Sequence, residues 1–373
     1  MQLKFFNIGI LGTGFMGRTH TYAYKSIPFY IQSPIALAEL KVVFSRSQER
    51  ANEFAKKYKF EKAFSEDWRK LIDCKEVDIV DNVLPNFLHY EPCSYALEKE
   101  KHVICEKPLA VRLSEARNLY EVSRKVKTKT MTMFNYRFIP AVQFMKEFID
   151  SGQLGRVFQI RCLFAHSGHV NPNRPWSWKE DFQTSGGGAS ADLGIHVMDL
   201  LRYLVGDVSK VVALEKIYFP ERKNSLGEIK KVTADDAVIC VLEFKNGAFG
   251  SLEATRVGTG YKNHLRIEIH GSEGGLIWNL EDLNYIKLFT VRGFGSRVGW
   301  ETILLDLPWW PPRGHIGGWQ IGHVFALYRF LESIAKDEDF EPSFYDGYQA
   351  QRILEAIHVS FRERRWVDLD LIQ

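Results

Sequence analysis

The chain is poor in cysteine, in net charge and in long apolar segments. Its 373 residues include five cysteines, and none of them forms a Cys-x-x-Cys pair. This odd set argues against a disulfide framework and a structural zinc site, so a reducing cytoplasm is the expected location. Lysine and arginine exceed aspartate and glutamate by three (49 − 46), which is too little for a nucleic-acid-binding protein. No apolar run approaches the ~20 residues that span a bilayer, so no membrane partner is expected.

What the chain does contain is typical of a globular protein. Apolar residues make up 45% and charged residues 25% of the sequence, a balance that supports a large buried core rather than disorder. At ~150 residues per domain, the length suggests two or three domains.

The first third of the chain predicts a parallel sheet. Short apolar runs suited to buried strands alternate with helical segments, at residues 5–11, 41–44, 77–83, 102–105 and 130–134. Ser47 and Ser114 are expected to cap two of the helices. Strands that alternate with helices predict an α/β fold with a doubly wound Rossmann sheet, which binds ligands where its strand order reverses.

From residue 135 onward the pattern changes to alternating strands. They are expected at 157–165, 237–244, 248–255 and 265–270. The pattern predicts an α+β domain with a large, mostly antiparallel sheet that is covered on one face. We therefore place a dinucleotide-binding domain at 1–134 and a substrate-binding and oligomerisation domain at 135–373, whose closing helices can pack back on the first domain.

Apolar residues of this second sheet predict self-association. The candidates for an uncovered apolar face are Val238, Leu242, Phe249 and Leu252. Large apolar patches are rarely left to water, so a homodimer or homotetramer is expected.

A glycine-rich turn follows the first predicted strand. Gly12-Thr13-Gly14-Phe15-Met16-Gly17 matches Gly-x-Gly-x-x-Gly and opens a helix. In a dinucleotide-binding turn, the first glycine permits the bend, the second lets the backbone approach the pyrophosphate, and the third allows close helix packing. The alternative is a turn whose glycines serve the backbone only; the strand-turn-helix context favours the dinucleotide.

The end of the second strand bears on the choice between NAD and NADP. An acid there would accept a hydrogen bond from the ribose 2′-hydroxyl, whereas arginine accommodates a 2′-phosphate. The chain has Ser45-Arg46-Ser47 and no acid, with Arg50 a turn later. The pattern favours NADP over NAD, the alternative being that Ser47 only caps a helix and Arg46 is solvated.

Two further segments carry ionisable side chains that could take part in catalysis. Glu106-Lys107-Pro108 ends a predicted buried strand, where a lysine is costly to bury without a partner. Asp192 and His196 lie four residues apart on a predicted helix, and a histidine beside a carboxylate is a tuned acid or base near neutral pH. The alternative for Lys107 is a lysine at the surface. The alternative for the second segment is that Asp192 only interacts with the helix dipole and that His196 is a hydrogen-bonded histidine of the core.

Together these segments resemble the glucose–fructose oxidoreductase / inositol dehydrogenase family of NAD(P)-dependent enzymes. The segments that carry the resemblance, in the family's order, are Gly12–Gly17, Glu106-Lys107-Pro108, Asn135-Tyr136-Arg137-Phe138 and Asp192 to His196. Within the family the chain is most similar to the levoglucosan, or pyranoside 3-, dehydrogenase branch. The segments for this branch are Phe134–Arg137, Leu154–Arg156, Trp176–Trp178 and Ser343–Gln349. The Trp309–Trp319 loop has no counterpart that we recognise.

The resemblance implies a dehydrogenase that transfers a hydride between a secondary hydroxyl of a sugar, anhydrosugar or inositol and a nicotinamide. It makes His196 the base that removes the hydroxyl proton, with Asp192 orienting its ring. Lys107 would stabilise the developing alkoxide. The residues implied in dinucleotide binding are Gly12, Thr13, Gly14, Phe15, Met16, Gly17, Ser45, Arg46, Arg50, Leu84, Pro85, Asn86, His89, Glu106, Lys107 and Asn135.

Aromatic and polar side chains near these motifs are candidates for contacts with the sugar. They are Tyr136, Arg137, His166, Trp178 and His315. Trp319 and His323 are further candidates for closing the pocket. A metal site of His166 and His169 with His264 or His270 lacks an acid or cysteine at a recognised spacing, so no metal is expected.

Two other functions remain open from the sequence. An NAD-dependent glycoside hydrolase of the same fold would use the same residues in its first half-reaction. A non-catalytic nucleotide-binding sensor would need none of Lys107, Asp192 and His196.

Overall fold

The computed structural model describes residues 2–291 and 299–372. Its residues pack into two compact units, which are described separately here. The first unit comprises Met1–Phe138, Pro308–Pro311 and Gln320–Tyr348, and the second comprises Ile139–Leu307, Pro312–Trp319 and Gln349–Gln373.

The first unit is built on a parallel six-stranded sheet with the order β3-β2-β1-β4-β5-β6. The strands are β1 (Lys4–Leu11), β2 (Ala36–Phe44), β3 (Lys62–Phe64), β4 (Ile79–Asn82), β5 (His102–Cys105) and β6 (Thr130–Thr132). The order reverses between β1 and β4, which confirms the predicted doubly wound sheet and its switch point. The short strand β3 was not anticipated from the sequence.

Helices and 3₁₀ turns connect these strands. They are α1 (Phe15–Tyr30), α2 (Gln48–Tyr58), α3 (Arg69–Ile72), η1 (Asn86–Leu88), α4 (Tyr90–Glu98), α5 (Leu113–Ser123) and η2 (Asn135–Phe138). Ser47 caps α2 as expected, since its hydroxyl accepts from the amide of Arg50. The predicted cap Ser114 is wrong: α5 already begins at Leu113, and the Glu115 carboxylate accepts from the amide of Arg112. A serine inside the first turn is too late to cap it.

A later segment completes the first unit. Helix α9 (Ile321–Lys336) packs along α1, with an edge-to-face contact between Phe325 and Tyr30 whose ring centroids are 6.1 Å apart. The Lys4 ammonium donates to the carbonyl oxygen of Ala335 at 2.6 Å. Residues far apart in the sequence therefore pack against one another in this unit.

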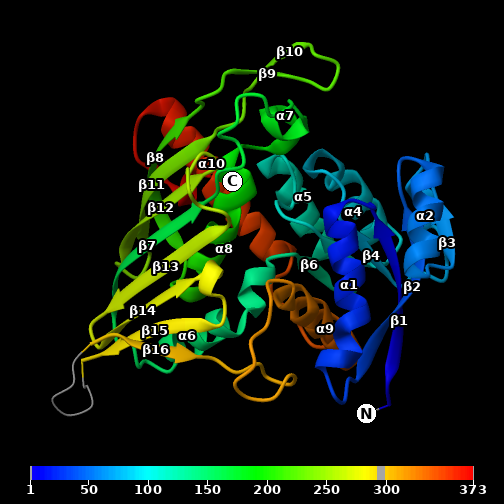
Figure 1. Ribbon diagram of the computed structural model, residues 1–373, viewed down its shortest axis with the longest axis horizontal. Helices are drawn as coiled ribbons and strands as arrows, with labels where there is room; N and C mark the ends of the chain where they lie inside the picture. Colours follow the sequence, from blue (N-terminus) through cyan, green and yellow to red (C-terminus); the bar gives the residue numbers. More distant parts are fainter. Residues whose placement is uncertain (1, 292–298, 373) are drawn as a thin grey trace. The chain divides into compact units, whose positions relative to one another are not determined.

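The second unit holds a nine-stranded sheet in its described residues, with the order β16-β15-β14-β13-β7-β12-β11-β8-β17. Figure 1 labels this sheet from β16 to β8. The strands are β7 (Val157–Ala165), β8 (Val208–Lys216), β11 (Ala237–Phe244), β12 (Phe249–Thr255), β13 (His264–Gly271), β14 (Gly274–Asn279), β15 (Tyr285–Thr290), β16 (Glu301–Leu304) and β17 (Val367–Asp368). All neighbours pair antiparallel except β7 and β12, which are parallel. The predicted mostly antiparallel sheet is confirmed.

The remaining elements of this unit are helices, turns and one small strand pair, β9 with β10. They are α6 (Pro140–Asp150), η3 (Trp178–Glu180), α7 (Phe182–Ser185), the π-helical turn η4 (Ser190–Gly194), α8 (Ile195–Leu204), β9 (Glu221–Lys223), β10 (Ile229–Lys231), η5 (Leu280–Asp282) and η6 (Leu369–Leu371). In α10 (Phe344–Glu363), residues 344–348 belong to the first unit and 349–363 to the second.

The sheet face chosen from the sequence is largely the wrong one. Val238, Leu242 and Leu252 are buried at 1% exposure or less, whereas Ile239 and Phe249 are exposed at 54% and 51%. Along β11 burial alternates strictly, so shifting the phase by one residue exchanges the two faces. Only Phe249 of the four candidates lies on the exposed face.

No helix among residues 2–291 and 299–372 is long and apolar enough to cross a membrane. All five cysteines lie in this described part and are free thiols.

Candidate active site

The glycine-rich turn has the geometry that dinucleotide binding requires. Gly12 adopts a φ of +121°, a backbone conformation that L side chains rarely adopt. A Cβ on Gly17 would lie 2.2 Å from the carbonyl oxygen of Gly12, so α1 can approach the turn this closely only with glycine there. A Cβ on Gly14 would meet nothing within 4 Å, which leaves room for a phosphate at the start of α1. These residues fit a dinucleotide.

Basic side chains gather beside this turn. A hollow of about 340 Å³ is lined by Thr13, Gly14, Arg18, Arg50, Glu53, Phe54, Lys57 and Tyr58. The Thr13 hydroxyl donates to the hydroxyl of Ser45 at 2.9 Å, which ties the turn to the end of β2. Arg46 is exposed and is not among the lining residues. Three cations and one carboxylate in the lining make the hollow a suitable place for an anionic group.

The loop after β4 is held by a buried histidine. Nε2 of His89 lies 2.8 Å from the carbonyl oxygen of Leu84, and Nδ1 lies 2.7 Å from that of Pro108. His89 is fully buried, and burial lowers its pKa. The geometry makes His89 a bridge between the Leu84-Pro85-Asn86 loop and the Lys107-Pro108 segment.

Glu106 and Lys107 follow β5 directly, so they lie at the carboxyl edge of the sheet. Glu106 is 6% exposed, and its Oε2 accepts from the backbone amide of Lys107 at 3.1 Å. Its other oxygen, Oε1, lies 3.1 Å from Nε2 of His20 on α1. Burial would raise the pKa of Glu106, but His20 and Lys107 lower it to about 2.

His20 joins two buried carboxylates. Its Nδ1 lies 2.8 Å from Oδ2 of Asp81 in β4, while its Nε2 faces Glu106. Burial would lower the pKa of His20, but Asp81 and Glu106 outweigh burial and raise it to about 10. His20 is therefore an imidazolium at neutral pH, and it donates one hydrogen bond to each carboxylate.

Two more groups complete this cluster. The Tyr24 hydroxyl donates to Oδ2 of Asp81 at 3.1 Å, and the His323 ring centroid lies 5.8 Å from that of His20. Burial and the charge of His20 lower the pKa of His323 to about 3. His323, considered from the sequence as a residue that closes the pocket, is 3% exposed on α9.

The same cluster brings together side chains that can ligate a metal ion. Among the described residues, His20, Glu106 and His323 are the group whose ligand atoms lie within 4.8 Å of one another; His166 and His169 are not part of such a group. A metal-binding histidine must offer a nitrogen lone pair. Both nitrogens of His20 already face carboxylates as donors, so the residues fit an ion network and we assign no metal.

In the second unit a buried aspartate shapes the turn that leads to Asp192. Oδ1 of Asp235 accepts from the amide of Gly188 and the hydroxyl of Ser190, both at 2.6 Å, and Oδ2 accepts from the amide of Ser190 at 2.9 Å. A Cβ on Gly188 would lie 1.6 Å from the carbonyl oxygen of Asp235. Gly188 thus permits a close backbone approach that no other residue would allow.

Asp192 lies in the π-helical turn, and His196 lies in the first turn of α8. The sequence predicted one regular helix here; such π turns occur often at functional sites. His196 is 7% exposed, and its Nδ1 is buried. Its ring centroid lies 6.2 Å from that of Phe164.

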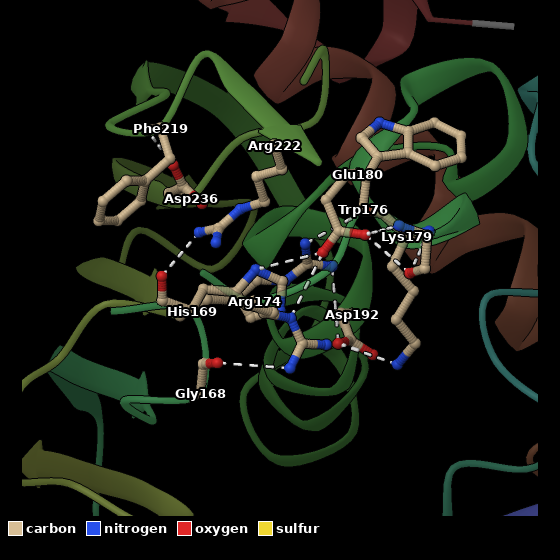
Figure 2. Close-up of polar contacts among 12 residues, drawn as sticks. Gly168, His169, Arg174, Trp176, Lys179, Glu180, Asp192, Phe219, Arg222 and Asp236 are labelled. Carbon is tan, nitrogen blue, oxygen red and sulfur yellow. Dashed lines mark hydrogen bonds and ion pairs between the residues drawn. The ribbon is translucent and has the colours of Figure 1, made fainter. Parts of the chain in front are cut away.

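Two cations approach the Asp192 carboxylate. Its Oδ2 lies 3.5 Å from Nζ of Lys179 and 3.6 Å from Nη2 of Arg256, and Figure 2 shows Lys179 and Asp192 directed toward one another. Arg256 is 2% exposed and also donates to the carbonyl oxygen of Lys179 at 3.3 Å. Two positive charges therefore lie beside the Asp192 carboxylate.

A second carboxylate anchors the segment that carries Lys179. Oε2 of Glu180 accepts from the amide and the hydroxyl of Ser177 at 2.8 and 2.7 Å. Its Oε1 lies 3.5 Å from Nε of Arg174 and 3.6 Å from Nδ1 of His169 (Figure 2). Burial, with Arg256 and Arg174, lowers the pKa of His169 to about 2, so that ring is neutral.

The candidates for sugar contacts lie in different environments. Nδ1 of His166 accepts from the amide of Gly168, and burial lowers its pKa against the opposing effect of Asp192. The Trp178 ring lies 5.7 Å beneath the Lys179 ammonium. His315 is exposed, and its Nδ1 donates to the carbonyl oxygen of Pro312 at 2.9 Å. His166 and Trp178 lie close to the Asp192 cluster within the second unit.

Tyr136 and Arg137 belong to the first unit. Tyr136 is 9% exposed and Arg137 is 3% exposed. Nη2 of Arg137 donates to Oδ1 of Asp346 at 2.9 Å, and Oδ2 of Asp346 accepts from the amide of Ser343 at 2.9 Å. This buried ion pair anchors the start of the Ser343–Gln349 segment against Arg137. It favours a structural role for Arg137.

Several residues of these clusters were not found from the sequence. His20, Asp81, Arg256 and Glu180 form ion pairs only with residues distant in the chain or across a turn, which no local pattern reveals. One signal was available: Asp81 stands in a strand expected to be buried on both faces, and a buried charge requires a partner.

Comparisons with known proteins cover nearly the whole chain. Residues 6–134 match the GFO/IDH/MocA model described as "Oxidoreductase family, NAD-binding Rossmann fold", and residues 146–369 match the same family's "C-terminal alpha/beta domain". Levoglucosan dehydrogenase of Pseudarthrobacter phenanthrenivorans is 35% identical over 98% of each chain. Myo-inositol 2-dehydrogenase of Thermotoga maritima is 29% identical over 97% of this chain and 98% of that one. A solved levoglucosan dehydrogenase complex with NADH and levoglucosan superposes with a TM-score of 0.95 at 35% identity, over 98% of this chain and 99% of that one.

Proposed function

The chain belongs to the GFO/IDH/MocA oxidoreductase family, and from this membership we propose that it oxidises a secondary ring hydroxyl of an anhydrosugar, a pyranose or an inositol. The family, the α/β fold class and the dehydrogenase activity predicted from the sequence are confirmed. The observation that carries the choice of substrate is the similarity to levoglucosan dehydrogenase along 98% of the chain.

The proposed chemistry begins with the substrate hydroxyl. Its O–H bond breaks, and the proton passes to Nε2 of His196, because Nδ1 of that ring is buried. Asp192, which pairs with Lys179 and Arg256, would orient the imidazole ring of His196. The ammonium of Lys107 donates to the oxygen as it becomes an alkoxide. When bound, the nicotinamide dinucleotide supplies the hydride acceptor.

For the dinucleotide we propose NADP as the preferred form. The family description supports NAD binding in general, and the finer choice rests on the side chains beside the glycine-rich turn. Arg18, Arg50 and Lys57 line the hollow beside Ser45, with Glu53 as its one acid, and the residues directly after β2 are Ser45, Arg46 and Ser47. A 2′-phosphate would meet three cations there, whereas a 2′-hydroxyl would lack an acid directly after the strand, where the usual acceptor stands.

Three broader assignments belong to the same proposal. Residues 1–134 act as the dinucleotide-binding domain, and residues 135–373 act in substrate binding and oligomerisation. The protein functions in the cytoplasm, in keeping with five free thiols. It forms a homodimer or homotetramer through the exposed sheet face that carries Phe158, Leu214, Ile239, Val241 and Phe249.

The test is an activity panel. Levoglucosan, simple pyranoses and inositols are each incubated with NAD and with NADP, and the absorbance of the reduced nicotinamide is followed. We expect turnover with at least one member of the panel, a higher kcat/KM with NADP, and loss of turnover in Lys107→Ala and His196→Ala. Near-wild-type rates in both variants would refute the assigned chemistry. Release of an aglycone without accumulation of reduced nucleotide would indicate the glycoside hydrolase instead.

A further inference from the structure

The buried ion cluster of the first unit is not used by the chemistry described so far. It consists of His20, Asp81, Glu106, Tyr24 and His323, and each of them is at most 6% exposed. A buried charge is expensive unless it is paired and hydrogen-bonded. Such a cluster beside a reacting group therefore requires an explanation.

We propose that His20 is a positioning residue for Lys107, which it holds in place through the carboxylate of Glu106. The proposal rests on the proposed function, because it assigns a task to the residue that stabilises the alkoxide there. It adds a residue on α1 to the machinery of the Glu106-Lys107-Pro108 segment.

The two oxygens of Glu106 carry the argument. Oε2 accepts from the backbone amide of Lys107 at 3.1 Å, and Oε1 lies 3.1 Å from Nε2 of His20. One carboxylate thus links the imidazolium on α1 to the peptide that leads into the Lys107 side chain. A hydrogen bond to an ionised acceptor is stronger than a neutral one, so the charge on Glu106 tightens both links.

Asp81 fixes His20 from the opposite side. Its Oδ1 and Oδ2 lie 3.0 and 2.8 Å from Nδ1 of His20, and the hydroxyl of Tyr24 donates to Oδ2. The ring of His20 therefore has a hydrogen-bond partner on both nitrogens, one from β4 and one from the end of β5. An imidazolium satisfies both carboxylates at once, which a neutral histidine with a single N–H cannot do.

Removal of the imidazolium has a defined electrostatic consequence. The groups that face His20 are Asp81 from β4, Glu106 beyond β5, Tyr24 on its own helix and His323 from α9. Without the cation, two buried carboxylates face one another, and such a pair does not remain fully ionised near neutral pH. Glu106 then takes up a proton at a higher pH than in the wild type, and its hold on the Lys107 amide weakens.

The principal test is His20→Gln, which keeps an N–H donor but removes the charge. We expect kcat to fall about 10- to 100-fold, the scale of a misplaced catalytic group, with little change in the KM for the dinucleotide. We also expect the acid limb of the kcat profile to move upward by at least one pH unit. The matched control is Ser26→Ala, a buried change on the same helix outside the cluster; its acid limb should not move.

A double-mutant cycle asks whether the effect passes through Glu106. In a Glu106→Gln background the additional change His20→Gln should cost at most about twofold in kcat, because the link is already broken. Full additivity of the two changes would overturn the proposal. So would an unchanged kcat profile in His20→Gln while Lys107→Ala is inactive. Near-wild-type turnover in Lys107→Ala would instead refute the proposed function.

A second variant covers the case in which His20→Gln does not fold. Asp81→Asn leaves Glu106 and Lys107 intact and removes one of the two charges that keep His20 protonated. We expect the alkaline limb of the kcat profile to move to lower pH by about one unit or more, as His20 loses its proton earlier. An alkaline limb at the wild-type position would overturn the proposal.

Discussion

The charge on His20 has a consequence for stability that is measured without any substrate. The pKa of His20 is raised to about 10 in the folded protein, against about 6.5 in an unfolded chain. A histidine with a raised pKa stabilises the fold fully below pH 6.5, and that stabilisation is lost as pH rises toward 10. Each pH unit in this window corresponds to about 1.4 kcal/mol, so between pH 7 and 9 the loss is roughly 2 to 3 kcal/mol.

The perturbation is again His20→Gln, and the assay is urea unfolding of wild type and variant at pH 7, 8 and 9. Tryptophan fluorescence and far-UV circular dichroism are followed together, since two units need not unfold in one step. The measured quantity is the difference in unfolding free energy between the two proteins at each pH. The buried thiols, whose pKa values burial raises, also lower stability at alkaline pH, but they do so in both proteins and cancel in this difference.

We expect the stability advantage of the wild type to shrink by roughly 2 kcal/mol or more from pH 7 to pH 9. A constant difference across the three pH values would show that His20 carries no extra proton in the folded state. That result would refute the reading of the cluster as an imidazolium between two carboxylates.

Three further predictions concern other parts of the chain. Arg50→Ala should raise the KM for NADP about tenfold and leave the KM for NAD within twofold, because one phosphate contact of about 1.4 kcal/mol is lost. Steady-state kinetics with both dinucleotides measure this. The control Glu53→Gln in the same hollow should not raise the KM for NADP. Arg256→Met should lower the unfolding free energy by about 1.5 to 3 kcal/mol, because it removes a guanidinium that is 2% exposed and that pairs with Asp192 and the carbonyl oxygen of Lys179. Lys179→Met, whose side chain is 38% exposed, should cost at most ~1 kcal/mol; equal losses in urea unfolding would contradict the burial argument. Ile239→Asp with Phe249→Asp should reduce the molar mass measured by light scattering to that of one chain, whereas Leu226→Asp, at a position 82% exposed, should not change it.

Local patterns were sufficient for most of the fold. Three features were recognised because each depends on residues that are adjacent in sequence: the glycine turn, the cap of α2 at Ser47 and the strand His102–Cys105. The buried face of β11 was predicted wrongly. An alternating pattern shows that a strand has two different faces, but it does not show which face the helices cover. That choice depends on packing with distant elements, which a single sequence does not reveal.

The candidate site also contains residues that local patterns identify and residues that they do not. Lys107, Asp192 and His196 were singled out because ionisable residues stand at strand or helix ends. The residues that surround them, such as Asp81 and Arg256, were missed because their partners lie far away in the chain. A buried acid in a strand could have signalled an ion pair, yet nothing in the sequence identifies a histidine on α1 as its partner.

The glycine turn and Lys107 are connected by one helix. Gly17 and His20 are three residues apart on α1, so they share a buried face of that helix. Gly17 lets α1 approach the turn closely, since a Cβ there would lie 2.2 Å from the carbonyl oxygen of Gly12. His20, one turn later, reaches Asp81 and Glu106. The position of α1 that forms the anion site at its N-terminus is therefore also the position from which His20 holds the Glu106-Lys107 segment. A substitution at Gly17 should disturb Lys107 as well as the dinucleotide, and it should lower kcat in addition to raising the KM for the dinucleotide.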